Sequence, residues 1–318
     1  MNKMNRMTNI NFVKIMSELG AGTRGASLGY DALVTASHNV GNTLLNKYPT
    51  VVVATKNEAL FSETPTPFAK HLHDIQDVFH NIHASVSGVL ESNNFPVVLA
   101  GAHSTAAATI QAIKKAEPNK KLGVVWIDAH ADLHSPYTTP SGNVHGMPLA
   151  IALKEDNKEN AINELDQSTI EAWENICGEP AIKAEDIVFF GVRDTEIPED
   201  ELILAKGIKN ISVEELRLKG SKLATQEALE YLSDCDHIYI SFDVDSMDSA
   251  ISNGTGTPVI NGFSVVEAYK IISYILKSGK VSCFEMVEVN PTLDHKGNIM
   301  AETAFDVLNE VVKILEKQ

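Results

Sequence analysis

Six short runs of apolar and β-branched residues recur along the chain, and they constrain its fold more than any other feature. They are TVVVAT at 50–55, FPVVLAG at 95–101, LGVVWIDAH at 122–130, DIVFFGVR at 186–193, HIYISFDVD at 237–245 and VSCFEMVEVN at 281–290. Stretches with helical periodicity lie between most of them, at 67–92, 104–116 and 264–278. This alternation predicts an α/β fold with a doubly wound, mainly parallel sheet, and continuously apolar strands predict helices on both faces.

The length and composition restrict the organisation and the partners of the chain. Its 318 residues contain no internal repeat and no Pro- or Ser-rich linker, so we expect a single domain over residues 1–318. The net charge of −16 disfavours nucleic acid and anionic membranes, because both need a concentrated basic face. Neither the polar segment 1–16 nor any later segment is typical of an export signal or a membrane span.

The cysteines indicate a compartment. Cys177, Cys235 and Cys283 are far apart and form no CxxC pair, which favours a reducing environment. We therefore expect a cytoplasmic protein.

Polar residues follow the expected strands at their carboxyl ends, where parallel α/β sheets bind ligands. Six of them are candidate metal ligands: His103, Asp128, His130, Asp132, Asp243 and Asp245. Side chains at i, i+2 and i+4 share one face of an extended strand, so the members of each cluster should converge. Carboxylates gathered in this way repel each other strongly unless divalent cations compensate them.

The number and type of these ligands indicate two ions. Six ligand residues exceed what one tetrahedral zinc takes and suit a pair of ions about 3.5–4 Å apart. Oxygen-rich ligation without thiolate favours manganese over zinc. A water that bridges two such ions becomes hydroxide near neutral pH, and hydroxide is the nucleophile of a hydrolase. A zinc deacetylase is one alternative, but it would need fewer carboxylates and one open zinc.

Several motifs resemble those of a known family. AGAHS, WIDAHADLH, SGNVHGMPLA, SFDVDSMD, GTGTP and EVNP occur in the order, and at about the separations, found in the arginase branch of the ureohydrolases. The resemblance extends from ELGAGTRGASLG at 18–29 to the last helix. It implies an arginase-like three-layer sandwich that hydrolyses L-arginine to L-ornithine and urea by means of a metal-bridging hydroxide.

The resemblance also implies roles for the polar residues. Two Mn²⁺ ions would bind each chain, one held by His103, Asp128, Asp132 and Asp243 and the other by His130, Asp128, Asp243 and Asp245. Asp128 and Asp243 would bridge the ions, and Asp132 would orient the hydroxide.

The same resemblance implies a substrate side. His145 would shuttle protons, for which an imidazole pKa of about 6.5 is suitable. Glu288 would pair with the guanidinium group, because two carboxylate oxygens can meet two N–H groups, and Thr257 would lie beside it. Ser141 and Asn143 would contact the α-carboxylate of arginine, and Glu196 and Glu199 its α-amino group.

Three positions depart from the family pattern. In AGAHS, Ala102 stands where most members of the family have an Asp, and its presence removes a partner of the metal ligands. Ser246 stands where the family usually has a Gly after FDVD. His134 stands where many arginases have an Asn that holds the α-carboxylate, and we expect the histidine to donate there instead.

Two alternatives remain within reach of the sequence. Another ureohydrolase would act on agmatine or a guanidino acid, but agmatine has no carboxylate for Ser141 and Asn143 to hold. A non-catalytic binding relative would have lost metal ligands, His145 or Glu288, and all are present. Relatives form trimers or hexamers, so the resemblance implies a homotrimer or a homohexamer.

Overall fold

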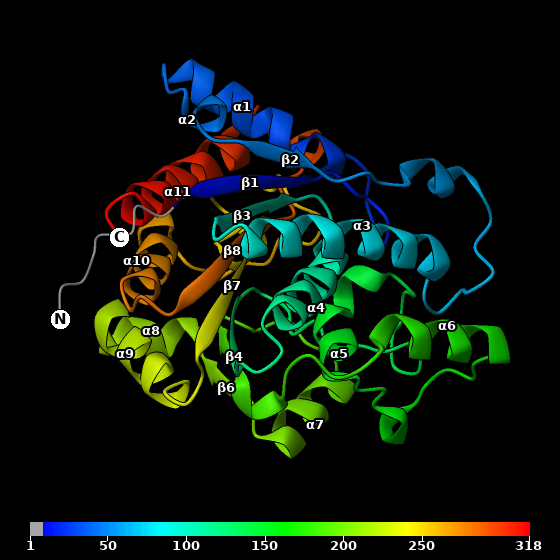
Figure 1. The fold of residues 1–318 in the computed structure, drawn as a ribbon. Helices are drawn as coiled ribbons and strands as arrows, with labels where there is room; N and C mark the ends of the chain where they lie inside the picture. Colours follow the sequence, from blue (N-terminus) through cyan, green and yellow to red (C-terminus); the bar gives the residue numbers. More distant parts are fainter. Residues whose placement is uncertain (1–8) are drawn as a thin grey trace.

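The computed structural model describes residues 9–318, whose eight strands form one parallel sheet (Figure 1). The strands are β1 (Ile10–Ile15), β2 (Thr50–Val52), β3 (Phe95–Ala100), β4 (Leu122–Ile127), β5 (Ile187–Phe190), β6 (Lys209–Ile211), β7 (His237–Asp243) and β8 (Val281–Val287). Their order is β2-β1-β3-β8-β7-β4-β5-β6. The expected α/β class with a parallel sheet is confirmed. Part of the N-terminal segment in which no export signal is expected, residues 1–8, lies outside the described residues.

Two strands lie outside the expected runs. β1 carries the partly exposed polar residues Asn11 and Lys14 between buried apolar ones, so it lacks the continuous apolar character of the other long strands. β6 is only three residues long and pairs with β5 at the edge of the sheet, where little apolar sequence is needed.

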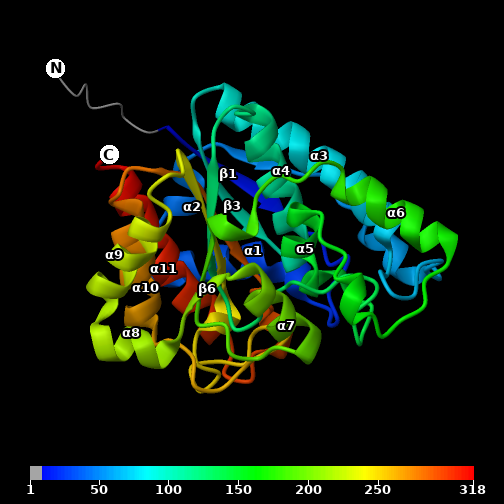
Figure 2. The same cartoon turned by 90° about the horizontal axis from the view of Figure 1, so that it is seen from below.

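Helices cover both faces of the sheet, which Figure 2 shows nearly edge-on. One face is covered by α3 (Leu72–Glu91), α4 (Ala106–Ala116), α5 (Pro148–Leu153) and α6 (Gln167–Cys177). The other is covered by α1 (Gly29–Asn39), α8 (Val213–Lys219), α9 (Ser221–Tyr231), α10 (Val265–Leu276) and α11 (Ile299–Leu315). The short α2 (Leu44–Lys47) packs with the second group, and α7 (Ile197–Lys206) lies near the edge formed by β6.

Alternate residues of the strands point into two separate cores, as expected for strands buried on both faces. Trp126 of β4 belongs to the same core as Phe79 of α3, whereas Phe242 of β7 belongs to the other core with Phe305 of α11. Within residues 9–318, every helix is too short or too polar to cross a bilayer.

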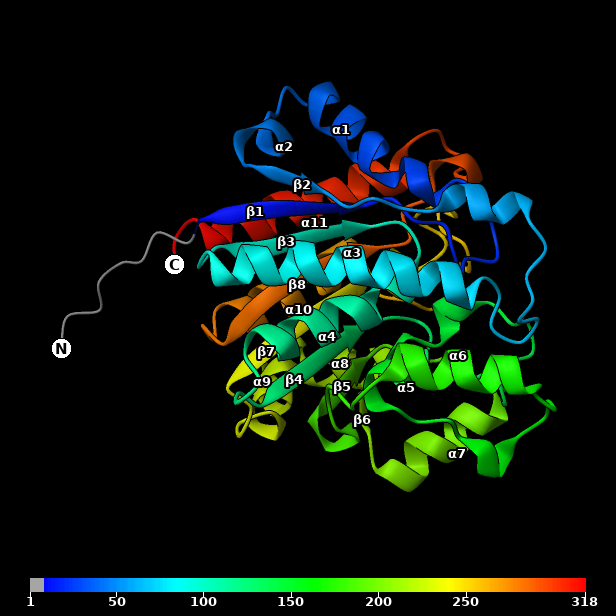
Figure 3. The ribbon, with the colours of Figure 1, turned by 45° about the vertical axis from the view of Figure 1, so that its right-hand side comes forward.

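The topology brings distant segments to one point. Strands β7 and β8, from the last third of the chain, fill the space between β3 and β4 (Figure 3). All four strands are parallel, so the residues that follow them gather at the middle of one edge of the sheet.

Candidate metal centre and active site

His103 follows β3 and faces three carboxylates. Its Nδ1 lies 3.1 Å from Oδ2 of each of three residues: Asp128, Asp132 and Asp243. Its Nε2 lies 2.7 Å from Oγ of Ser241, and its ring stacks on the indole of Trp126 with 4.2 Å between centroids. The serine and the indole therefore hold the imidazole with Nδ1 directed at the carboxylates.

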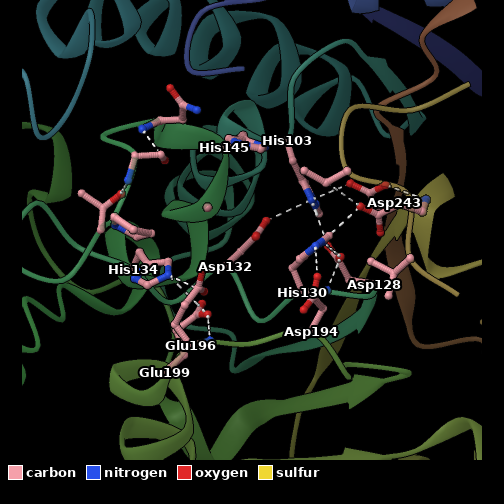
Figure 4. Close-up of a pocket in the computed structure, with 18 of the residues that line it drawn as sticks. His103, Asp128, His130, Asp132, His134, His145, Asp194, Glu196, Glu199 and Asp243 are labelled. Atoms are coloured by element: carbon pink, nitrogen blue, oxygen red, sulfur yellow. Dashed lines mark hydrogen bonds and ion pairs between the residues drawn. The ribbon is translucent and has the colours of Figure 1, made fainter. Parts of the chain in front are cut away.

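His130 forms a second cluster next to the first (Figure 4). Its Nδ1 lies 3.1 Å from Oδ2 of Asp245 and 3.5 Å from Oδ1 of Asp128, and its Nε2 lies 3.6 Å from Oδ2 of Asp194. Asp128 thus faces one histidine with each of its oxygens. Asp243 contacts the first cluster through Oδ2, while its Oδ1 accepts the backbone N–H of Asp245 at 2.8 Å.

Turns, and not extended strands, bring these side chains together. β4 ends at Ile127, and the carboxylate of Asp128 accepts the backbone N–H of His130 at 2.7 Å. Asp132 has a φ of 52°, in the left-handed region. The expected convergence is present, but the expected strand geometry is wrong. Residues i and i+2 of a strand lie about 6–7 Å apart, and carboxylate-capped turns bring their side chains closer.

The donor set fits metal ions. Among the described residues, His103 Nδ1 and Asp128 Oδ2 are buried and lack a hydrogen-bond partner, although they lie 3.1 Å apart. Burial and the charge of Asp128 raise the pKa of Asp132 to about 6, and burial with the charges of Asp245 and Asp128 raises the pKa of Asp243. Buried donors without partners and crowded carboxylates are what divalent cations would satisfy.

Glu288 follows β8 and lies against the backbone of His103. Its Oε1 accepts the N–H of His103 at 2.7 Å, its φ is 65°, and burial raises the pKa of its carboxyl to about 7. A Cβ at Gly256 would lie 3.6 Å from its Oε2, so the 255–259 loop passes beside it. The hydroxyl of Thr257, however, donates to Oδ2 of Asp245 at 3.2 Å. The threonine therefore supports a candidate metal ligand.

His145 lies in the short turn Val144–Gly146, and its backbone N–H donates to the carbonyl of Gly20 at 3.0 Å. Burial and the nearby charges of His130 and His103 lower the pKa of His145 to about 4. The sequence-based expectation had assumed the ordinary imidazole pKa of about 6.5. The partly buried ring is neutral near pH 7.

The predicted site residues surround one cavity of about 440 Å³. Its lining includes the six candidate ligands and also His134, Ser141, Asn143, His145, Glu196, Glu199 and Thr257. Glu288 is the predicted residue that stands behind this lining, next to His103. Asp194 also lines the cavity, and the hydroxyl of Ser241 contacts Nε2 of His103. The position of Ser241, two residues before Asp243, is the signal that could have identified it.

His134 pairs with the two glutamates that are expected at the α-amino end of the substrate. Its Nε2 lies 2.9 Å from Oε2 of Glu196 and 3.4 Å from Oε2 of Glu199, and its Nδ1 lies 3.2 Å from the hydroxyl of Thr138. The imidazole is therefore on the side expected to bind the α-amino group, because two carboxylates attract it there. Figure 4 shows these three residues grouped apart from the clusters around His103 and His130.

The two glutamates also begin α7. Glu196 is the N-cap residue, and Oε2 of Glu199 accepts its backbone N–H at 3.2 Å. The hydrogen bond from His134 lowers the pKa of Glu196 to about 2, whereas burial raises the pKa of Glu199 to about 8. Of the two glutamates, Glu196 is therefore the ionised one, and Glu199 resists ionisation.

Comparison with known proteins adds an independent observation. The sequence model of the Arginase family matches residues 9–313. The arginase of Bacillus subtilis (strain 168) is 32% identical over 310 residues, which are 95% of this chain and 97% of that protein. The arginase of Staphylococcus aureus (strain COL) is 33% identical over 312 residues, 96% of this chain and 97% of that protein. The crystal structure of Entamoeba histolytica arginase in complex with L-ornithine has a TM-score of 0.82 at 25% identity, over 96% of this chain and 99% of that one.

Proposed function

Because this chain belongs to the arginase family, we propose that it is a hydrolase that converts L-arginine and water to L-ornithine and urea with two Mn²⁺ ions. One observation carries the proposal: each carboxylate oxygen of Asp128 faces a different imidazole, which is an arrangement that suits a ligand shared by two ions. We further propose that residues 1–318 form one domain of this type, since all eight strands join one sheet.

His103, Asp128, Asp132 and Asp243 would hold one ion, and His130, Asp128, Asp243 and Asp245 the other. When bound, the ions supply Lewis acidity, which lowers the pKa of water and polarises the guanidinium group. The choice of manganese is supported by the excess of oxygen donors and the absence of cysteine from the six ligand residues.

The protein would position the substrate and move the protons. Glu288 would pair with the guanidinium group and hold its carbon near Asp132. The Asp132 carboxylate would accept a hydrogen bond from the attacking water and return the proton to the leaving nitrogen. His145 would carry protons between this site and solvent, the role that the family resemblance implies.

The amino-acid end of arginine would lie nearer the mouth of the cavity. Ser141 and Asn143 would contact the α-carboxylate, and Glu196 and Glu199 the α-ammonium group. The Entamoeba histolytica arginase holds L-ornithine, an amino acid with the same two groups, which supports an amino-acid substrate here. Agmatine lacks the carboxylate, so another ureohydrolase activity would leave Ser141 and Asn143 without a partner.

Location and assembly are further parts of the proposal. The three cysteines are unpaired and buried, which supports the cytoplasm as the location. A homotrimer or a homohexamer remains a prediction from the family resemblance.

The test of this function is urea release from the manganese-loaded protein. L-arginine, agmatine and 4-guanidinobutyrate should be compared at equal concentration, and L-ornithine should form in equal amount to urea. Arginine should exceed agmatine by two or more orders of magnitude in kcat/KM, because buried groups that recognise a carboxylate are left unpaired by an analogue without one. Comparable kcat/KM values for arginine and agmatine would mean that the protein is a broader guanidine hydrolase and not an arginase.

The placement of His134 gives a second expected result. Its Nε2 occupies the oxygens of Glu196 and Glu199 that an α-ammonium group would use. In His134→Asn the shorter side chain should free them and lower KM for arginine by roughly tenfold, the typical effect of a hydrogen bond to a charged group. 4-Guanidinobutyrate has no ammonium group and should serve as the control. A raised KM for arginine would mean instead that His134 itself binds the substrate.

A further inference from the structure

Lys70 lies beside the part of the cavity that would receive the α-carboxylate. It belongs to the connection between β2 and α3, which is drawn in blue and descends to the loop after β4 in Figure 3. Its backbone N–H donates to the carbonyl of Gly142 at 2.8 Å. Its Nζ donates to Oδ1 of Asn143 at 3.1 Å. The contact joins residues 73 positions apart and places a cation against a residue of the cavity wall.

The packing of the two loops fixes this contact. Gly142 has a φ of 75°, and a Cβ there would lie 2.0 Å from the carbonyl oxygen of Pro67. Only glycine permits this approach, so residues 67–70 lie directly on the 141–143 loop.

The lysine determines which end of the Asn143 amide faces the cavity. An ammonium group has donors only, so the amide oxygen must face Lys70 and the NH₂ group must point away from it. A Cβ at Gly22 would lie 2.8 Å from Nδ2 of Asn143 and 3.9 Å from Nε2 of His145. The NH₂ group is therefore on the side of His145, which lines the cavity. It is presented there as a donor, which is what a carboxylate needs.

The charge of the lysine has a second effect. Of the seven carboxylates that line the cavity, the metal ions would compensate Asp128, Asp132, Asp243 and Asp245, which leaves Asp194, Glu196 and Glu199. These suit a guanidinium and an ammonium group but repel a carboxylate. Other cations nearby are engaged by the backbone. Arg193 donates to carbonyls that include those of Gly191 and Ile260, and Arg24 donates to those of Ala21 and Thr23.

We infer that Lys70 is a specificity-determining residue for the carboxylate end of the substrate. It orients the amide of Asn143 and offsets the negative charge of the cavity where an anionic group must enter. The inference rests on the proposed function, because it assumes a substrate with a guanidinium group at one end and a carboxylate at the other.

The test uses the full-length, manganese-loaded protein and three variants. Lys70→Met removes the charge and the hydrogen bond, and Lys70→Gln removes the charge but keeps a donor for Asn143. Lys56→Met is the matched control, because Lys56 lies on the same connection but pairs with Asp74 and Asp77 of α3. Each protein is assayed for kcat and KM with arginine. Ornithine and putrescine, which differ by the carboxylate, are compared as inhibitors, and melting temperatures report on folding.

Lys70→Met should raise KM for arginine and the inhibition constant of ornithine by roughly tenfold, the effect of losing one charge-assisted hydrogen bond. It should leave kcat and the inhibition constant of putrescine within about twofold, and Lys70→Gln should fall between Lys70→Met and the unmodified protein. Equal changes for ornithine and putrescine, or changes of less than twofold in KM for arginine, would overturn the inference. Absence of urea release by the unmodified protein would instead overturn the proposed function, and ornithine binding measured directly would still test Lys70.

Discussion

Replacement of Asp128 by Asn is expected to remove both the metal ions and the activity. Asp128 faces His103 with Oδ2 and His130 with Oδ1, so a single amide disturbs the donor sets of both ions. An amide nitrogen cannot coordinate as the carboxylate oxygen does. Loss of an outer partner of a ligand already costs about 10–100-fold in metal affinity, and loss of a shared ligand should cost more. We expect kcat/KM for arginine to fall by at least about 1,000-fold.

Metal analysis and melting temperature separate this effect from misfolding. The unmodified protein should contain two Mn²⁺ per chain and melt at a higher temperature with manganese than with a chelator, because a ligand of the native state stabilises it. Asp128→Asn should lose this difference. Asp234→Asn changes an exposed aspartate and should keep it. Full activity with one ion per chain, or full metal content in Asp128→Asn, would contradict the shared-ligand role.

The class of fold could be predicted from the sequence because most of its strands are buried on both faces. Trp126 and Phe242 lie in continuous apolar runs that mark their strands without reference to the rest of the chain. Strand β1 was missed because Asn11 and Lys14 interrupt its apolar residues, and β6 because an edge strand of three residues has no distinctive pattern. The residues of a short strand do not by themselves indicate that the strand will lie at the edge of the sheet.

The ligands of the site could be named from the sequence, but their geometry could not. Carboxylates and imidazoles that end apolar strands are rare enough to be informative. The turn at Asp132, with its φ of 52°, depends on the surrounding packing and not on the i, i+2 spacing. The strand order likewise decides that Glu288 meets His103, 185 residues earlier in the chain. Such pairs follow from which strands become neighbours.

The two features that distinguish this cavity depend on contacts between loops. His134 faces Glu196 and Glu199 because both glutamates lie at the beginning of α7 and present their carboxylates to it. Lys70 contacts Asn143 because Gly142 allows the loop at 67–70 to approach closely. Neither interaction has a local pattern, so the residue types could be noted in the sequence but their partners could not.

Glu288→Gln should abolish most of the activity while leaving the metal ions in place. Oε1 of Glu288 accepts the backbone N–H of His103, so the oxygen of a glutamine must take that position and its NH₂ group must take the position of Oε2. The NH₂ group would then face the N–H groups of the guanidinium, donor against donor, in a buried site without compensating charge. Removal of one partner of a buried ion pair costs about 3–5 kcal/mol, so kcat/KM for arginine should fall by roughly 100- to 1,000-fold or more.

The measurements that isolate this role of Glu288 are steady-state kinetics, manganese content and melting temperature, with the exposed Glu164→Gln as the control. Because the backbone hydrogen bond to His103 is retained, the variant should bind two ions and melt within a few degrees of the unmodified protein. Agmatine carries the same guanidinium group as arginine, so its turnover or inhibition should weaken by the same factor, whereas binding of ornithine, which lacks this group, should change little. A loss confined to arginine would assign Glu288 to the amino-acid end of the substrate, and a loss of manganese would make it a support of His103 rather than a partner of the guanidinium.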